Sequence, residues 1–163
     1  MVIAKTYHHT PVGVAYIECS PKGITAIRLV KQIEESLDPK HPTLVWAIQQ
    51  LDRYFYKSPT LPFTLPLDAK GTPFQHKVWR ALQTIPVGKT YTYGSLAKTL
   101  DMPNGARAIG TACGKNPIWL VVPCHRVVGS NGKLTGYAWG IDIKRKLLQH
   151  ESQTSVQTQL QLF

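Results

Sequence analysis

Three consecutive side chains in the second half of the chain have the types needed for nucleophilic chemistry. In the segment VVPCHRVVG, residues 121–129, Cys124 supplies a thiol, His125 an imidazole and Arg126 a fixed positive charge. A free cysteine is often just a small buried apolar residue, but a neighbouring base or cation favours the thiolate, the form that attacks electrophiles. The pattern indicates a nucleophilic cysteine, with a buried structural cysteine as the alternative.

The residues before Cys124 predict how it is positioned. The apolar run 118–122 predicts a strand, and Pro123 ends it because proline lacks the backbone donor that a strand needs. Cys124 is therefore expected at the end of an element, where reactive side chains tend to be accessible. Adjacent side chains on an extended chain point to opposite faces, so His125 needs a turn or a water molecule to reach the thiol.

The size and composition of the chain limit the class of protein. With 163 residues, 43% of them apolar, it can form one ordinary domain or two small ones with a buried core. Its three cysteines form no CxxC pair, which argues against a disulfide scaffold or a cysteine-rich zinc module and favours a reducing compartment. The sequence shows neither a secretory signal nor a run of about 20 apolar residues, so we expect a soluble protein without membrane contact.

The positive charge of the chain is concentrated in one half. The formal net charge is +10. Residues 1–69 contain seven lysines and arginines against six aspartates and glutamates, whereas residues 70–152 contain twelve against three. A basic region beside a nearly neutral one is typical of a surface that binds a polyanion. Nucleic acid is the first candidate, and a charge that serves only solubility is the alternative.

The first half predicts a small antiparallel sheet covered by one helix. Alternating apolar residues between turn residues predict strands at 3–9, 12–19 and 24–30. Apolar residues at helical spacing predict a helix over 42–56. A proline-rich connection follows, and we expect a domain boundary near residue 69, where the charge also changes. The expected fold class is α+β.

The second half predicts a mostly helical domain. A helix is expected over 72–84, then a short helix over 93–100 with Thr92 as N-cap, and another over 105–113 that Asn104 can cap. Two short helices around a tight turn favour a helix-turn-helix. The second of them is rich in alanine and glycine, which lets its backbone come close either to another helix or to a nucleic-acid groove.

One more helix is predicted over residues 141–151. Its apolar residues are expected to face inward, and Lys144, Arg145 and Lys146 are expected to form a solvated face. Residues 153–163 carry no charge and are expected to form a loosely held tail.

Four motifs together resemble those of one family. They are Asn116-Pro117, PCHRV at 123–127, GYAWG at 136–140 and His150-Glu151 at the end of the last helix. In order and spacing they resemble the O6-alkylguanine-DNA alkyltransferases, also called methylated-DNA–protein-cysteine methyltransferases. The resemblance covers about residues 72–151. It implies a ribonuclease H-like N-terminal domain over 1–69 and a winged-helix-like DNA-binding domain over 70–152.

The same resemblance implies a direct transfer reaction without a cofactor or a metal. Cys124 would take the alkyl group from O6 of a guanine flipped out of duplex DNA, with O4 of thymine as a second candidate position. The thioether is permanent, so each protein molecule would act once. In the family's pattern His125 takes the thiol proton through a water, Glu151 orients the imidazole, Asn116 braces the turn, and Tyr93 hydrogen-bonds to the leaving guanine.

The resemblance also implies residues that contact DNA and the substrate. Arg107 would enter the base stack in place of the flipped nucleotide. The other DNA-binding residues expected are Thr92, Tyr93, Ala106, Cys113, Lys115 and Arg126. The expected substrate pocket consists of Tyr93, Val122, Pro123, Tyr137, Ala138 and Trp139. Because the positions of Cys113 and Trp139 vary within the family, the tolerance for bulky alkyl groups stays open.

Each of these side chains also has an ordinary structural interpretation. His125 alone could be a hydrogen-bonded core histidine, and Glu151 a carboxylate at a helix end. Tyr93 could be a packing aromatic, and Arg107 a surface arginine that contacts phosphate. An indole at Trp139 would fill the space that a benzyl group needs if it lines the pocket, or anchor the loop if it turns away.

Other function classes remain alternatives on the sequence alone. A non-enzymatic relative that binds alkylated DNA has tryptophan in place of the cysteine, so Cys124 argues against it. A regulator that uses only the helix-turn-helix and a cysteine hydrolase are the others. Cys19 with His8 or His9 offers too few ligands at too loose a spacing for a zinc site. We expect a monomeric, cytoplasmic enzyme, or a nuclear one in a eukaryote, whose partner is duplex DNA with little sequence specificity.

Overall fold

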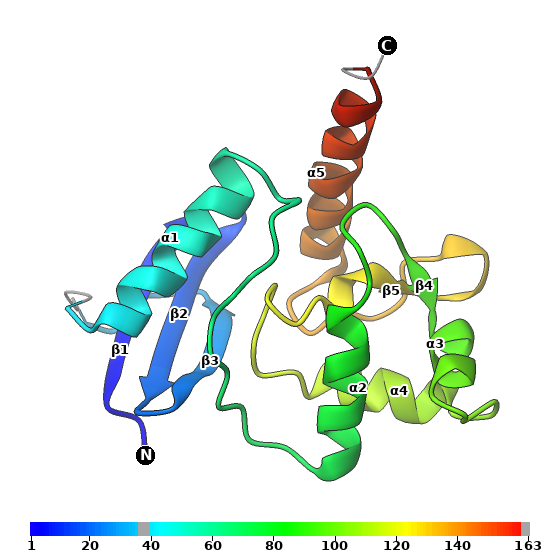
Figure 1. The fold of residues 1–163 in the computed structure, drawn as a ribbon, viewed down its shortest axis with the longest axis horizontal. Coiled ribbons are helices and arrows are strands. Elements are labelled where there is room, and N and C mark those ends of the chain that lie inside the picture. Colours follow the sequence, from blue (N-terminus) through cyan, green and yellow to red (C-terminus); the bar gives the residue numbers. More distant parts are fainter. Residues whose placement is uncertain (36–39, 161–163) are drawn as a thin grey trace. The chain divides into compact units, whose positions relative to one another are not determined.

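The computed structural model describes residues 1–35 and 40–160, which divide into two compact units (Figure 1). The first unit consists of Met1–Lys70 together with Pro117–Trp119, and the second of Gly71–Asn116 with Leu120–Phe163. The division after Lys70 falls next to the boundary expected at residue 69. The return of residues 117–119 to the first unit has no signal in the sequence.

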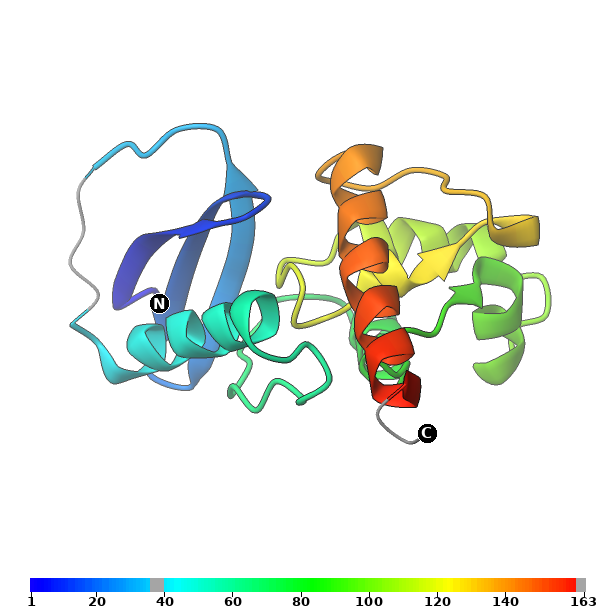
Figure 2. The same cartoon turned by 90° about the horizontal axis from the view of Figure 1, so that it is seen from above.

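The first unit contains a three-stranded antiparallel sheet in the order β1-β2-β3. Strand β1 is Ala4–Thr10, β2 is Gly13–Ser20 and β3 is Gly23–Val30, each close to its predicted range. Helix α1, Pro42–Tyr56, lies along one face of this sheet, as Figure 2 shows. Alternate residues of the strands and one side of the helix form the core. Its fully buried side chains include Ala15, Ile17, Ile24, Ile27, Leu44, Ala47 and Leu51.

The apolar run 118–122 does not form the predicted strand. Only Ile118 pairs, in a parallel bridge with Ile27, and Trp119 stacks on Phe55 with ring centroids 6.2 Å apart. At Leu120 the backbone turns into the left-handed region, with φ of 70°, where a strand cannot continue. All five residues are nevertheless buried. A short apolar run does not distinguish a buried strand from a buried loop, which is why this prediction was wrong.

The helices of the second unit follow the prediction closely. Helix α2 is Pro73–Gln83, α3 is Tyr93–Thr99 and α4 is Ala106–Gly114, and α4 packs against both of the others. Thr92 is the N-cap of α3, because its side chain accepts a hydrogen bond from the backbone of Ser95. Asn104 does not cap α4; the N-cap is Gly105, without a side-chain hydrogen bond.

A short parallel ladder that the sequence did not predict connects two parts of the site. Strand β4, Tyr91–Thr92, pairs with β5, Val127–Val128. Since α3 starts directly after β4 and a 3-10 turn at Cys124–Arg126 directly precedes β5, this ladder fixes the start of α3 beside the PCHRV segment. Tyr93 and Cys124 are brought together across 31 positions of sequence by this pairing.

The C-terminal helix differs from its prediction in length and in the side chains it buries. Helix α5 runs over Ile141–Leu160, so the expected tail is helical up to residue 160, because neither glycine nor proline interrupts the sequence there. Residues 161–163 of the expected tail lie outside the described residues. Lys144, expected on a solvated face, is completely buried. No helix in residues 1–35 and 40–160 is both long and apolar enough to cross a membrane.

Candidate active site

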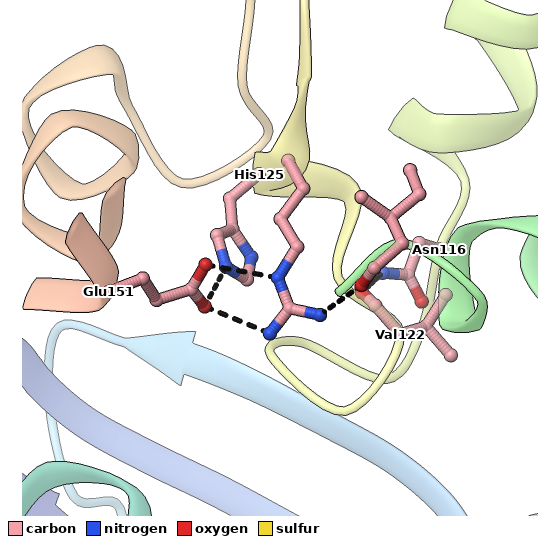
Figure 3. A network of polar contacts seen from close by, with 6 residues as sticks. Asn116, Val122, His125 and Glu151 are labelled. Carbon is pink, nitrogen blue, oxygen red and sulfur yellow. Dashed lines mark hydrogen bonds and ion pairs between the residues drawn. The ribbon is translucent and has the colours of Figure 1, made fainter. Parts of the chain in front are cut away.

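Cys124 lies at the start of the 3-10 turn that follows Pro123, and its side chain is only 4% exposed. The turn is braced by Asn116, whose amide nitrogen donates to the carbonyl of Val122 at 2.8 Å (Figure 3). The same nitrogen donates to the Cys124 sulfur at 3.4 Å. One buried amide therefore fixes both the backbone before the thiol and the thiol itself. This geometry fits the bracing role that the resemblance implied for Asn116.

His125 and Glu151 form a buried pair beside the turn. Nε2 of His125 lies 2.7 Å from Oε1 of Glu151, and both side chains are completely buried (Figure 3). No side chain or backbone atom of the described residues hydrogen-bonds to Nδ1 of His125. If Nε2 carries the hydrogen that the carboxylate accepts, Nδ1 has the free lone pair. The imidazole is thus oriented by an acid on one side and available as a base on the other.

Arg126 binds the same carboxylate and not a surface ligand. Its Nε and Nη2 donate to the two oxygens of Glu151, each at 3.0 Å, and Nη1 donates to the carbonyl of Ile85 at 2.7 Å. The side chain is 91% buried. Arg126 was expected to bind DNA, whereas in this structure a bidentate pair and a carbonyl use its guanidinium. Its position instead holds Glu151 against His125.

The electrostatics of this network set the resting protonation states. Burial raises the pKa of the Cys124 thiol, while the Asn116 hydrogen bond and the Lys144 charge oppose that rise. Burial lowers the pKa of His125 despite the attraction of Glu151. Burial would raise the pKa of Glu151, but His125 and Arg126 lower it to about 2. A neutral thiol, a neutral imidazole and an ionised carboxylate follow, so deprotonation of the thiol requires a proton acceptor such as His125.

A cavity of about 740 Å³ opens onto the thiol. Its walls come from the start of α3, from α4, from Cys124 and from the segment after β5. The lining residues are Thr92, Tyr93, Gly94, Ala106, Arg107, Gly110, Thr111, Cys113, Gly114, Cys124, Gly129, Ser130, Thr135, Gly136, Tyr137 and Ala138. Glycine and alanine on α4 leave space in the cavity because their side chains are small. A methyl group built at Gly110 would lie 3.8 Å from the Tyr93 ring. The volume is in the range of a small-molecule pocket.

The structure brings together many, but not all, of the side chains that the sequence singled out. Thr92, Tyr93, Ala106, Arg107, Cys113, Tyr137 and Ala138 share the cavity with Cys124. Asn116, His125 and Glu151 lie in the buried network behind the thiol. Val122 and Pro123 are buried and do not line the cavity. Lys115 is exposed at the end of α4, also outside the cavity wall.

Trp139 does not take the place expected for it. Its ring meets Tyr137 edge-on, with centroids 5.4 Å apart, and it does not line the cavity, whereas Tyr137 does. Of the two interpretations open for Trp139, this placement favours the loop anchor over an indole that fills the alkyl pocket, because the Tyr137 ring offers it an apolar contact. Thr135 and Gly136, which sequence reasoning missed, form that part of the wall.

Two family models together match most of the chain. Residues 3–69 match the family model of the 6-O-methylguanine DNA methyltransferase ribonuclease-like domain, and residues 73–153 match that of the DNA binding domain of the same enzymes. A methylated-DNA–protein-cysteine methyltransferase of Mycolicibacterium paratuberculosis is 43% identical over 152 residues, which cover 90% of both chains.

Solved structures agree in fold as well. The crystal structure of Mycobacterium tuberculosis O6-methylguanine methyltransferase has a TM-score of 0.83 at 40% identity and covers 94% of both chains. That of Mycobacterium tuberculosis OGT in complex with DNA has a TM-score of 0.83 at 39% identity and covers 93% of this chain and 94% of the other. From the two domain matches and these relatives together, the chain belongs to the 6-O-methylguanine DNA methyltransferase family.

Proposed function

We propose that the protein repairs duplex DNA by moving a methyl or other alkyl group from O6 of guanine directly and irreversibly to the sulfur of Cys124. The observation that carries this proposal is the position of the thiol, which faces a cavity on one side and has the His125–Glu151 pair beside it. The curated relatives are named for such a transfer to a protein cysteine, and the family is that of 6-O-methylguanine DNA methyltransferases. O4 of thymine is a second substrate position to be tested.

The proposed chemistry uses groups of this chain only. The thiol proton of Cys124 passes through a water molecule to Nδ1 of His125, and Glu151 stabilises the imidazolium that forms. The sulfur then forms a bond to the alkyl carbon while the bond from that carbon to O6 breaks, and the electron pair moves to the purine. A hydrogen bond from the Tyr93 hydroxyl stabilises the purine as it gains negative charge. No step of this chemistry breaks the carbon–sulfur bond of the product thioether, so the thiol is not restored and one molecule repairs one lesion.

Access to the target base requires that the nucleotide leave the duplex. We propose that α4 lies in the minor groove, where its small residues allow close approach, and that the flipped base enters the cavity between Tyr93 and Cys124. Arg107 lines the rim of this cavity and is exposed, so it can occupy the space that the base leaves in the stack. Contacts of this kind read little sequence, which suits a monomeric enzyme that scans DNA.

Two observations disfavour the alternatives. A DNA-binding protein without transfer activity does not need a thiol held at the cavity wall by Asn116. A cysteine hydrolase does not need a DNA-binding domain, and residues 73–153 match the family model of one. The helix-turn-helix with a reactive thiol in its cavity favours alkyl transfer over both.

The test is a mass measurement after exposure to duplex DNA that contains one O6-methylguanine. The intact protein should gain one methyl group, peptide mapping should place it on Cys124, and a second equivalent of DNA should add nothing. Cys124→Ser should accept no methyl group and keep its affinity for DNA. A methyl group on Cys113 or Cys19, or repeated turnover by one molecule, would contradict the proposal.

A further inference from the structure

Lys144 occupies an unusual position for a lysine. It lies on the first turn of α5 and is completely buried, whereas its neighbours Arg145 and Lys146 are exposed. Its Nζ donates to the backbone carbonyls of Thr135 and Gly136, at 3.4 Å each. No carboxylate of residues 1–35 and 40–160 forms an ion pair with it. A buried charge without a counterion costs stability, so its presence calls for a physical reason.

The surroundings of Nζ are the walls of the cavity. It lies 5.8 Å from the ring centroids of both Tyr93 and Tyr137, close enough for a cation–π interaction with each. Both rings line the cavity, as do Thr135 and Gly136, whose carbonyls Lys144 binds. The ammonium group is thus placed behind the wall and holds two of its aromatic side chains and one of its backbone segments.

The titratable groups that interact with Lys144 are those of the site. They are the thiols of Cys113 and Cys124, the imidazole of His125 and the phenols of Tyr93 and Tyr137. Burial lowers the pKa of Lys144, and the two thiols raise it. By reciprocity the ammonium lowers the pKa of both thiols. The ammonium also disfavours the imidazolium of His125, so the charged form that it favours in this site is the thiolate and not the imidazolium.

We propose that Lys144 is a positioning residue for alkyl transfer, whose buried ammonium supplies the positive potential that favours the Cys124 thiolate and holds the 135–137 segment against the cavity. The proposal rests on Cys124 as the acceptor in the proposed function. During transfer the negative charge moves from sulfur to the purine, and Lys144 lies beside the Tyr93 ring as well as near the thiol. One fixed positive charge therefore stabilises the negative charge first on sulfur and then on the purine, as preorganised electrostatic groups do.

The test measures how fast Cys124 reacts with iodoacetamide as a function of pH, without DNA, by peptide mass mapping. Lys144→Gln keeps a donor for the two carbonyls and removes the charge; Lys144→Met removes both. Both variants should move the midpoint of the pH profile upward and react at least tenfold more slowly near pH 8. Lys146→Met, which removes the same charge from an exposed position two residues away, is the control and should change the rate less than twofold.

A second readout separates positioning from simple support of the fold. Because the buried ammonium lacks a counterion, Lys144→Met should leave the thermal midpoint unchanged or raise it, while methyl transfer from DNA slows at least tenfold and DNA affinity stays the same. Unaltered pH profiles of Cys124 in both folded variants would overturn the proposal. So would a loss of stability in Lys144→Met that Lys144→Gln restores together with full reactivity.

The same experiments tell this inference apart from the proposed function. If Lys144→Met does not fold, Lys144→Gln alone gives the comparison with the parent. A shifted iodoacetamide profile in a parent protein that takes no methyl group from DNA would sink the proposed function and leave the role of Lys144 at the thiol supported. Methylation of Cys124 in the parent protein, with an unshifted iodoacetamide profile in the Lys144 variants, would support the proposed function and refute the role of Lys144.

Discussion

Replacing Glu151 by glutamine should remove most of the acid sensitivity that the buried network gives the protein. Glu151 has a pKa of about 2 in the folded chain against an ordinary value of 4.5. Because each tenfold change in proton affinity corresponds to about 1.4 kcal/mol, the ionised carboxylate stabilises the fold by about 3 kcal/mol. This contribution is fully present above about pH 4.5 and is lost as the pH falls toward 2, because the folded state has the lower pKa.

The geometry supports a loss of this size. Glu151 accepts hydrogen bonds from Nε2 of His125 and from two nitrogens of Arg126, and all three side chains are buried. Glu151→Gln would leave the Arg126 guanidinium as a buried charge without a counterion, and removal of one partner from a buried pair costs about 3–5 kcal/mol. At pH 7 the variant should therefore be less stable by about 3 kcal/mol, the lower end of that range, and the imidazolium of His125 should be harder to form.

The assay is urea denaturation followed by circular dichroism at several pH values between 7 and 2.5. The difference in free energy of unfolding between parent and Glu151→Gln should be about 3 kcal/mol at pH 7 and should shrink toward zero at the acid end. Asp142→Asn is the control, because that carboxylate is exposed on the same helix and pairs with the exposed Arg145. Parallel pH profiles for the parent and Glu151→Gln would refute the reasoning. Methyl transfer at pH 7 should fall about 10²- to 10⁴-fold in the variant.

Three further predictions concern DNA and the loop. Arg107→Ala should slow repair of duplex DNA far more than reaction with the free base O6-methylguanine, because the lost step is base extrusion; equal losses in a rate comparison would contradict this. Trp139→Gly should lower the rates for methylated and benzylated guanine together, by about two- to tenfold, since the indole supports Tyr137 and does not line the cavity. A gain in rate confined to benzylated guanine would show that the indole fills the pocket. Binding to duplex DNA should weaken steeply with salt and vary little with sequence, with each phosphate contact adding about −0.9 to the slope of log K against log salt in titrations.

Much of the fold and the reactive centre could be predicted from the sequence, because both depend on local patterns. Alternation and turn residues define the three strands, and helical spacing with caps such as Thr92 defines most helices. The PCHRV segment, with Asn116 before it and Glu151 after it, identified the members of the buried network. Their roles were implied by the resemblance of these motifs to one family, because each residue alone also has an ordinary structural interpretation.

Only the tertiary structure decided what each charged side chain faces. Arg126 and Lys144 look like surface cations in sequence, but α5 brings Glu151 to Arg126 and places Lys144 behind two aromatic rings of the cavity. The run 118–122 is apolar as a strand would be, yet Leu120 turns the chain. Hydrophobic periodicity reports which residues avoid water and not which partners they meet. Those partners come from segments distant in sequence, and only packing brings them into contact.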